Sequence, residues 1–152
     1  MNFYFSFVVP NKSRLEFGLI EQVWKEIKGK FNQYVFEQWE ELCRNAVPRL
    51  NIEGKSFNPA QRWWGNEMDR KPMEIDVVAE STDKTSLLIG EAKWVNKISV
   101  SKIVDELKAK TKNLPFIYHQ KPVYVLFLKQ MPLKIPDEII IITPSDIIAV
   151  LR

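Results

Sequence analysis

Two apolar, strand-like runs of this chain carry charged side chains in their interior. Residues 73–79 form the first run, around Asp76. Residues 87–94 form the second, around Glu91 and Lys93. Ionised side chains are rarely buried unless they are paired or bind a metal. The chain must therefore fold so that these charges either neutralise one another or hold an ion.

The pattern Glu-x-Lys is frequent in this chain, but only one copy lies on a strand-like run. In a strand, residues two apart share a face, so Glu91 and Lys93 lie together with Leu87 and Ile89, while the intervening residues face the other side. In a helix, residues two apart point in different directions. The remaining copies lie in two helical patterns and a predicted turn: Glu26/Lys28, Glu106/Lys108 and Glu53/Lys55.

The two charged runs are expected to be neighbouring strands. Residues 81–84, with the sequence Ser-Thr-Asp-Lys, have the composition of a tight turn. Strict alternation places Glu74 and Asp76 on one face of the first strand, and Ile75 and Val77 on the other.

Two carboxylates and one ammonium group converge if the faces bearing Asp76 and Glu91 coincide. Carboxylate oxygens suit Mg²⁺ or Mn²⁺, and Lys93 would then stand beside an attacking water or a phosphate. The alternative is a cross-strand salt bridge on a solvent-facing sheet. Residue types and spacing alone do not decide between these two interpretations.

Composition limits the classes of function. The 152 residues are enough for one domain with a real core, and 27% charged residues are typical of a soluble globular protein. A net charge of +3 permits a nucleic-acid partner without arguing for one. The single cysteine, Cys43, excludes an internal disulfide and fits a cytoplasmic protein. The single histidine, His119, argues against a histidine-dependent nucleophile and is expected at the surface or in packing.

The order of predicted elements indicates a mixed α/β sheet with flanking helices. The long connection through a helix at 99–114 predicts that the strands on either side of it are parallel. Asn32 is a plausible cap that separates two N-terminal helices. The expected helices are 16–28, 32–47, 99–114 and 146–151, and the expected strands are 61–65, 72–80, 85–94, 121–129 and 138–142.

The first ten residues are apolar and aromatic but too short to span a membrane, and they lack the features of a signal peptide. We therefore expect no membrane association. This segment either covers the domain's own core or packs on a neighbouring surface. Both interpretations stay open.

Asp76, followed on the next strand by Glu91-Ala92-Lys93 after a helix that bears a glutamate, resembles the PD-(D/E)XK nuclease superfamily. The chain more closely resembles a domain of unknown function that follows a winged helix at the C-terminus of archaeal-type ATPases. The segments that carry this likeness are residues 3–11, 39–44, 62–65, 74–78 and 90–94.

The resemblance implies a restriction-endonuclease-like αβββαβ core and a role for each matching residue. Asp76 and Glu91 would be metal ligands, for Mg²⁺ or Mn²⁺, and Lys93 the catalytic lysine. Glu40 would be the helix glutamate that assists the metal or water, with Glu37 as second choice because it points away from the apolar stripe. For either glutamate, the alternative is a solvated helix face.

Nucleic-acid contacts are expected from a second group of residues. Arg62, Trp63 and Trp64 can stack on bases, although packing is an equal alternative, and adjacent tryptophans on a strand face opposite ways. Related nucleases often place a glutamine or lysine on the helix that follows the catalytic strand. Lys102 is the candidate for that position here.

The function expected from this resemblance is metal-dependent hydrolysis of DNA phosphodiester bonds. The alternative is a catalytically silent nuclease-like fold that serves an ATPase as a DNA-binding or protein-interaction module. Residues 1–30 would form a packing segment and helix at the interface to an ATPase or winged-helix region, in the same or another chain, and residues 31–152 the nuclease-like domain. A homodimer is a further candidate assembly. No ATP binding is expected, because Arg49 occupies the position at which a phosphate-binding loop ending in 54–56 needs its first glycine.

Overall fold

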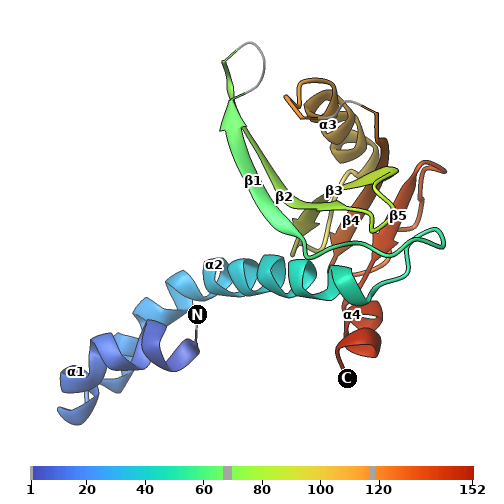
Figure 1. Ribbon diagram of the computed structural model, residues 1–152. Helices are drawn as coiled ribbons and strands as arrows, with labels where there is room; N and C mark the ends of the chain where they lie inside the picture. The colour runs from blue at the N-terminus through green and yellow to red at the C-terminus, as the bar shows by residue number, and fades with distance from the viewer. Residues whose placement is uncertain (1, 67–69, 117–118) are drawn as a thin grey trace. The chain divides into compact units, whose positions relative to one another are not determined.

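The second charged run forms the centre of a five-stranded sheet in the computed structural model, which describes residues 2–66, 70–116 and 119–152 (Figure 1). The strands lie side by side in chain order. Antiparallel pairing joins the first three, and parallel pairing joins the last three. Their bounds are β1 (Gln61–Asn66), β2 (Pro72–Glu80), β3 (Ser86–Lys93), β4 (Lys121–Leu128) and β5 (Ile139–Ile142).

Helices cover both faces of this sheet. On one face lies α3 (Val100–Lys112), which buries Ile103, Val104 and Leu107 against the strands. On the other face lie the last turns of α2 (Ile20–Ala46) and α4 (Pro144–Leu151). The order α2-β1-β2-β3-α3-β4 confirms the predicted αβββαβ arrangement, and the parallel pairing of β3 with β4 confirms the predicted crossover.

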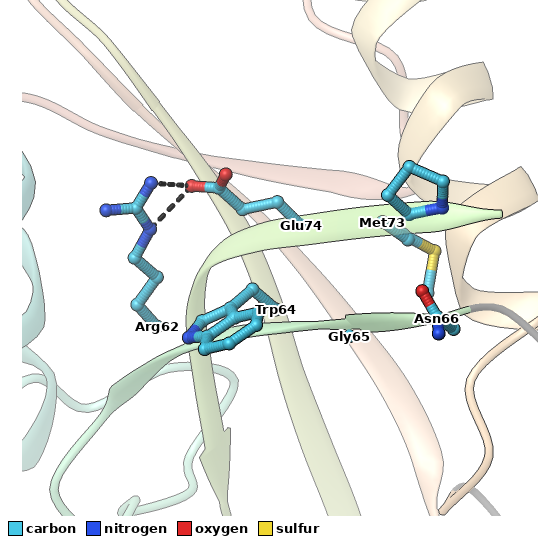
Figure 2. A pocket seen from close by; sticks show the side chains of 7 residues that line it. Arg62, Trp64, Gly65, Asn66, Met73 and Glu74 are labelled. Atoms are coloured by element: carbon cyan, nitrogen blue, oxygen red, sulfur yellow. Dashed lines mark hydrogen bonds and ion pairs between the residues drawn. The ribbon is translucent and has the colours of Figure 1, made fainter.

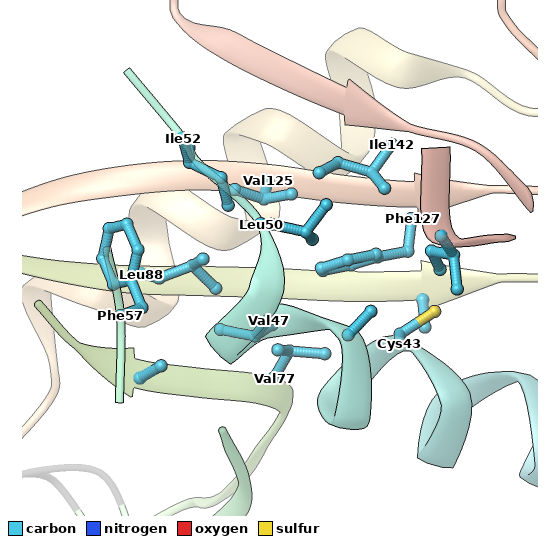
Figure 3. Close-up of a cluster of buried hydrophobic side chains, with 14 of the residues drawn as sticks. Cys43, Val47, Leu50, Ile52, Phe57, Val77, Leu88, Val125, Phe127 and Ile142 are labelled. Atoms are coloured by element: carbon cyan, nitrogen blue, oxygen red, sulfur yellow. The ribbon is translucent and has the colours of Figure 1, made fainter. Parts of the chain in front are cut away.

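The core on the α2 face fixes this helix to the centre of the sheet. Cys43 and Val47 are fully buried against side chains of β2, β3 and β4 that include Val77 and Phe127 (Figure 3). The indole N–H of Trp39 donates a hydrogen bond to the Phe127 carbonyl at 3.3 Å. Burial raises the pKa of the Cys43 thiol, so this cysteine is a packing residue in its neutral form.

Side chains of β3 alternate between the two faces as predicted. Leu87 and Ile89 pack with α3, whereas Leu88 and Ala92 pack with α2. Gly90 lies on the α2 face, opposite Val77 of β2.

The predicted alternation of β2 is wrong, because this strand contains a bulge. Gln61 lies opposite Val78 and Trp63 opposite Ile75, so β2 holds one extra residue in this stretch. As a consequence Ile75 packs with α3, while Val77 packs with α2. Strict alternation predicts instead that these two side chains share a face. A prediction from strict alternation fails here, because the extra residue of a bulge reverses the faces that the side chains beyond it take.

The predicted break between two N-terminal helices is also wrong. A single helix, α2, runs through Gly29 and Asn32. Apolar residues continue in helical phase across this region, from Ile27 to Phe31 and Val35. A glycine inside a helix costs only about 1 kcal/mol, so the continuous stripe outweighs the local signals. The predicted helix over 16–28 instead begins at Ile20, after the short α1 (Lys12–Glu16) and the left-handed Gly18 at φ 76°.

The chain divides into two compact units, residues 1–38 and residues 39–152. The first unit holds a small core of Phe7, Val23 and Ile27, against which Leu15 and Tyr34 pack. Residues 3–10 are helical here, and Phe7 packs within the unit while Phe5 is exposed. The predicted domain division after residue 30 stays a prediction.

No helix among the described residues is long and apolar enough to cross a lipid bilayer. His119 is exposed, in line with the expected surface position.

Gly90 provides a test of the packing between β3 and its neighbours. A Cβ at this position would lie 3.1 Å from the Val125 carbonyl oxygen, 3.2 Å from the Phe127 ring and 3.3 Å from the Val77 Cβ. We expect Gly90→Val to lower the free energy of unfolding by about 1–3 kcal/mol, because overpacking forces neighbouring groups apart. Urea denaturation would measure this change.

Gly29→Ala is the matched control for this substitution. Apart from the neighbouring residues and backbone of the helix itself, no atom lies within 4 Å of a Cβ at Gly29, so alanine should stabilise α2 by about 0.5–1 kcal/mol. A Gly90→Val protein as stable as wild type would contradict the described packing of β2, β3 and β4.

Candidate functional site

The site begins where strands β2 and β3 separate. Their antiparallel ladder runs from Glu80 opposite Leu87 to Val77 opposite Gly90. Beyond this pair, a side chain replaces the backbone as hydrogen-bond acceptor: Asp76 Oδ2 accepts a hydrogen bond from the Ala92 N–H at 3.0 Å. Asp76 thereby satisfies a buried backbone donor at the fork between the strands.

Asp76 and Glu91 are brought together at this fork. Each is only 6% exposed, and their carboxyl groups share a hydrogen bond. Two acids so close to each other in a buried environment cannot both ionise at low cost. Burial, together with the hydrogen bond and the charge of Glu91, raises the pKa of Asp76 to about 7.

Glu91 is the ionised partner of the pair. Lys93 Nζ lies 3.3 Å from Glu91 Oε2, and Lys110 Nζ of α3 forms an ion pair with Oε1. Burial opposes ionisation of Glu91, but the hydrogen bond with Asp76 and the charges of Lys110 and Lys93 outweigh it, so its pKa is lowered. For Lys93, burial is outweighed by the charges of Glu91, Asp76 and Glu40, so its pKa is raised and the ammonium form is favoured.

The last turns of α2 contribute a third acid and a third cation. Glu40 is 6% exposed, and its Oε2 lies 3.6 Å from Arg44 Nη1. Arg44 also donates a hydrogen bond to the Asp76 carbonyl at 3.0 Å and so joins the helix to the fork. Of the two predicted glutamates, Glu40 is buried at this position, whereas Glu37 is exposed and accepts a hydrogen bond from Gln33.

The donor set suits a hard divalent cation in part. Mg²⁺ is commonly held by one or two carboxylates, with water and substrate phosphate completing the shell. Asp76 and Glu91 provide such a pair. Within the described part of the chain, no group of three or more His, Cys, Asp or Glu side chains is arranged to hold a metal ion. Substrate or water would therefore have to supply the remaining oxygens.

The two predicted nucleic-acid contacts lie in different surroundings. Arg62 on β1 is half-exposed and pairs with Glu74 of β2, with its Nε 2.5 Å from Oε1 (Figure 2). The hydrogen bond to Glu74 raises the pKa of Arg62, and the charges of Glu40 and Asp76 add to it. Lys102 is exposed on α3 and lies 4.0 Å from Glu106. A nucleic-acid contact by either residue stays a prediction.

Sequence reasoning missed two cations of the site, Arg44 and Lys110. Arg44 stands four residues after Glu40, a spacing that places two side chains side by side on a helix, so the sequence did contain a signal. Lys110 stands three residues after the buried Leu107, at the border of the α3 stripe. Nothing in the sequence distinguishes it from Lys102, because only the tertiary structure shows which lysine reaches Glu91.

The raised pKa of Asp76 predicts how stability depends on pH in the absence of metal. Because the folded pKa of about 7 lies above the ordinary value of 3.8, protonated Asp76 stabilises the fold below pH 4, and this contribution is lost as pH rises through 7. Asp76→Asn imitates the protonated side chain. The variant should therefore become more stable than wild type as pH rises, by at most roughly 4 kcal/mol. Urea unfolding with EDTA from pH 4 to 8 would measure this.

Asp83→Asn is a control of opposite sign. In the turn before β3, Asp83 accepts hydrogen bonds from Ser81 and Thr85, which lower its pKa. Its ionised form therefore stabilises the fold at neutral pH, and this contribution is lost as pH falls. If the stability difference between Asp76→Asn and wild type did not change with pH, the Asp76–Glu91 pair described above would be incorrect.

Comparison with known proteins places the chain in a family. The model of a family described as archaeal and bacterial proteins of unknown function, DUF234, matches residues 4–111. The uncharacterised protein MJECL04 of Methanocaldococcus jannaschii is 31% identical over 115 residues, which cover 72% of this chain. The chain spans only 25% of the length of that relative. No solved structure matches. Because the family model covers most of the chain, including β1 to β3 and nearly all of α3, the chain belongs to the DUF234 family.

Proposed function

We propose that this protein is a divalent-metal-dependent nuclease that hydrolyses DNA phosphodiester bonds, in the manner of the PD-(D/E)XK superfamily. The observation that carries the proposal is the buried pair of Asp76 and Glu91 at the strand fork, with the Lys93 ammonium group 3.3 Å from Glu91. The αβββαβ order of elements supports it, because it presents the acids and the lysine in the order that the superfamily resemblance requires.

Asp76 and Glu91 would hold Mg²⁺ or Mn²⁺ through carboxylate oxygens. When bound, the ion would supply positive charge to a phosphate oxygen and lower the pKa of water. Asp76 must lose its proton for this role. Its pKa of about 7 means that proton loss and cation binding are linked near neutral pH.

Lys93 would act as a fixed positive charge. Its raised pKa favours the ammonium form, which can donate hydrogen bonds to a phosphate oxygen as negative charge develops during attack at phosphorus. It is therefore better suited to stabilising charge than to removing a proton from water.

Glu40 and Arg44 would serve as positioning residues. Glu40 is a buried carboxylate within electrostatic reach of Asp76 and Lys93, where it can accept a hydrogen bond from the attacking water. Arg44 holds the Asp76 backbone through its 3.0 Å hydrogen bond. Hydrolysis then adds water across a P–O bond: the incoming water loses a proton, and the leaving oxygen gains one.

A catalytically silent module is the second candidate function, and one observation favours it. Both oxygens of Glu91 already pair with lysines, as expected of a structural salt-bridge network. In this case the fold would bind DNA or an ATPase region without turnover. The short span of the chain relative to MJECL04 leaves room for additional regions in related proteins.

Cleavage of plasmid and single-stranded DNA in the presence of Mg²⁺ or Mn²⁺ separates the two functions. We expect Asp76→Ala and Lys93→Ala to lower the cleavage rate by about 100-fold or more, because each removes charge at the reacting phosphate. Lys121→Ala, an exposed lysine at the opposite end of the β3–β4 pair from Lys93, should leave the rate unchanged and is the matched lysine control. Activity that persists in both Asp76→Ala and Lys93→Ala would come from a contaminant, and DNA binding without cleavage by wild type would favour the silent module.

Lys110 allows metal binding to be tested without an activity assay. Its ammonium group forms an ion pair with the Glu91 carboxylate, so Lys110 competes with a metal cation for that carboxylate. We expect Lys110→Met to bind Mn²⁺ about tenfold more tightly, a change of roughly 1.4 kcal/mol, and Glu91→Gln to bind it more weakly. Calorimetric titration would measure both. Equal Mn²⁺ affinities in wild type, Lys110→Met and Glu91→Gln would exclude Glu91 as a ligand.

A further inference from the structure

The two adjacent tryptophans of β1 have different surroundings. The ring of Trp63 packs against Phe116, with centroids 5.6 Å apart, and lies close to Gly65, where a Cβ would come within 2.9 Å of the indole. Trp63 is therefore a packing residue of the α3 face. Trp64, on the opposite face, is 79% exposed.

The exposure of Trp64 is the highest of the tryptophans in the described chain. Trp24 is 52% exposed but has the Lys28 ammonium group 5.4 Å from its ring centroid, and Trp94 packs against Trp39. Among the described residues, no aromatic ring or cation lies over Trp64. Tryptophan is enriched at interfaces, because its large, rigid ring offers an apolar surface together with a hydrogen-bonding N–H group.

A groove of about 650 Å³ lies beside the Trp64 indole. Figure 2 shows Arg62 next to the indole and Asn66 and Met73 toward the other end. The groove is thus formed by an aromatic face and an apolar side chain, with polar groups at its rim.

The charges of the groove favour a planar neutral ligand over a phosphate. Arg62 is paired with Glu74, so the two side chains together carry no net charge and do not form an anion site. They still offer guanidinium donors and a carboxylate acceptor, and the Asn66 amide offers both. Donors and acceptors beside a stacking surface match the edge and face of a nucleobase.

We infer that the groove beside Trp64 binds an unpaired nucleobase, with the base stacked on the indole and its edge hydrogen-bonded by Arg62, Asn66 or Glu74. In an intact duplex both faces of a base are stacked, so a base must be unpaired or extruded to reach Trp64. Resting on the proposed function, this site gives the nuclease a preference for single-stranded or branched DNA, because Trp64 lies opposite Glu74 of β2, two residues from Asp76 on the same strand.

The test of base binding requires no catalysis. Fluorescence anisotropy in EDTA would compare a labelled single-stranded oligodeoxythymidylate with a duplex of the same length. Loss of one base–aromatic stack should weaken single-strand binding by Trp64→Ala about tenfold or more. Trp64→Phe should retain most of the affinity. Trp24→Ala, which removes another exposed tryptophan, should change nothing.

Two further readouts distinguish stacking from a structural effect. Because Trp64 is exposed, Trp64→Ala should keep the Tm of wild type. The dependence of binding on salt concentration should also be unchanged, since stacking neutralises no phosphate. Duplex binding should be equal in Trp64→Ala and wild type.

Several outcomes would overturn the inference: no single-strand binding by wild type, equal affinity of Trp64→Ala and wild type, or an equal loss for duplex and single strand. These outcomes are independent of the nuclease proposal, because EDTA prevents cleavage. If single-strand binding requires Trp64 but no DNA is ever cleaved, the base site stands and the nuclease proposal fails. If DNA is cleaved but Trp64→Ala leaves the ratio of single-strand to duplex cleavage unchanged, the substrate preference fails.

Discussion

The hydrogen bond from the Ala92 N–H to the Asp76 carboxylate is the interaction on which the site depends. It forms where the ladder between β2 and β3 ends, and it replaces the backbone acceptor that the separating strand would have supplied. The same contact fixes Asp76 beside Glu91. The fork thus has a structural and an electrostatic consequence: a buried donor is satisfied, and two acids are held close enough to share a proton.

The cost of burying acids at this fork is offset by cations from three separate elements. Lys93 comes from β3, Lys110 from α3 and Arg44 from α2. With Glu40 counted beside Asp76 and Glu91, the site holds three acids and three cations, whose formal charges balance.

Under the proposed function, a bound divalent ion would leave the site with an excess of positive charge, and a phosphodiester would then be attracted to it. Under the alternative, the balanced set is simply a network that joins the helices to the sheet. The same geometry serves both, and the response of Mn²⁺ affinity to Lys110 distinguishes them.

The bulge in β2 has consequences for both faces of the sheet. It allows Ile75 to fill the α3 core and Val77 to fill the α2 core. On β1, which pairs with β2, two adjacent tryptophans also take opposite faces: Trp63 packs against Phe116, and Trp64 is exposed to solvent. Trp64 lies opposite Glu74 of β2, two residues from Asp76, so the aromatic groove and the acidic fork share this strand. The family match from residue 4 to 111 spans both strands.

The sequence by itself determined the elements and their order. Continuous apolar runs with turn residues between them specified β2 and β3 closely, and a long helical crossover specified the parallel pairing of β3 with β4. It also identified Asp76, Glu91 and Lys93, because charges inside apolar strands are rare enough to be informative. Local signals at Asn32 misled, since a short-range cap preference is weaker than an apolar stripe that continues in phase.

Only the tertiary structure decided which long side chains reach the acidic pair and which face each residue takes. Lys110 and Lys102 occupy the same helix, and their difference arises from how α3 packs on β3. The bulge moved Ile75 to the face opposite Val77, which no alternating pattern can reveal, because it results from the pairing of β2 with β1. Hydrophobic periodicity and composition report on residues that are close in the sequence. The contacts named here join residues that are far apart in it, so these contacts are fixed only when the sheet and its helices pack together.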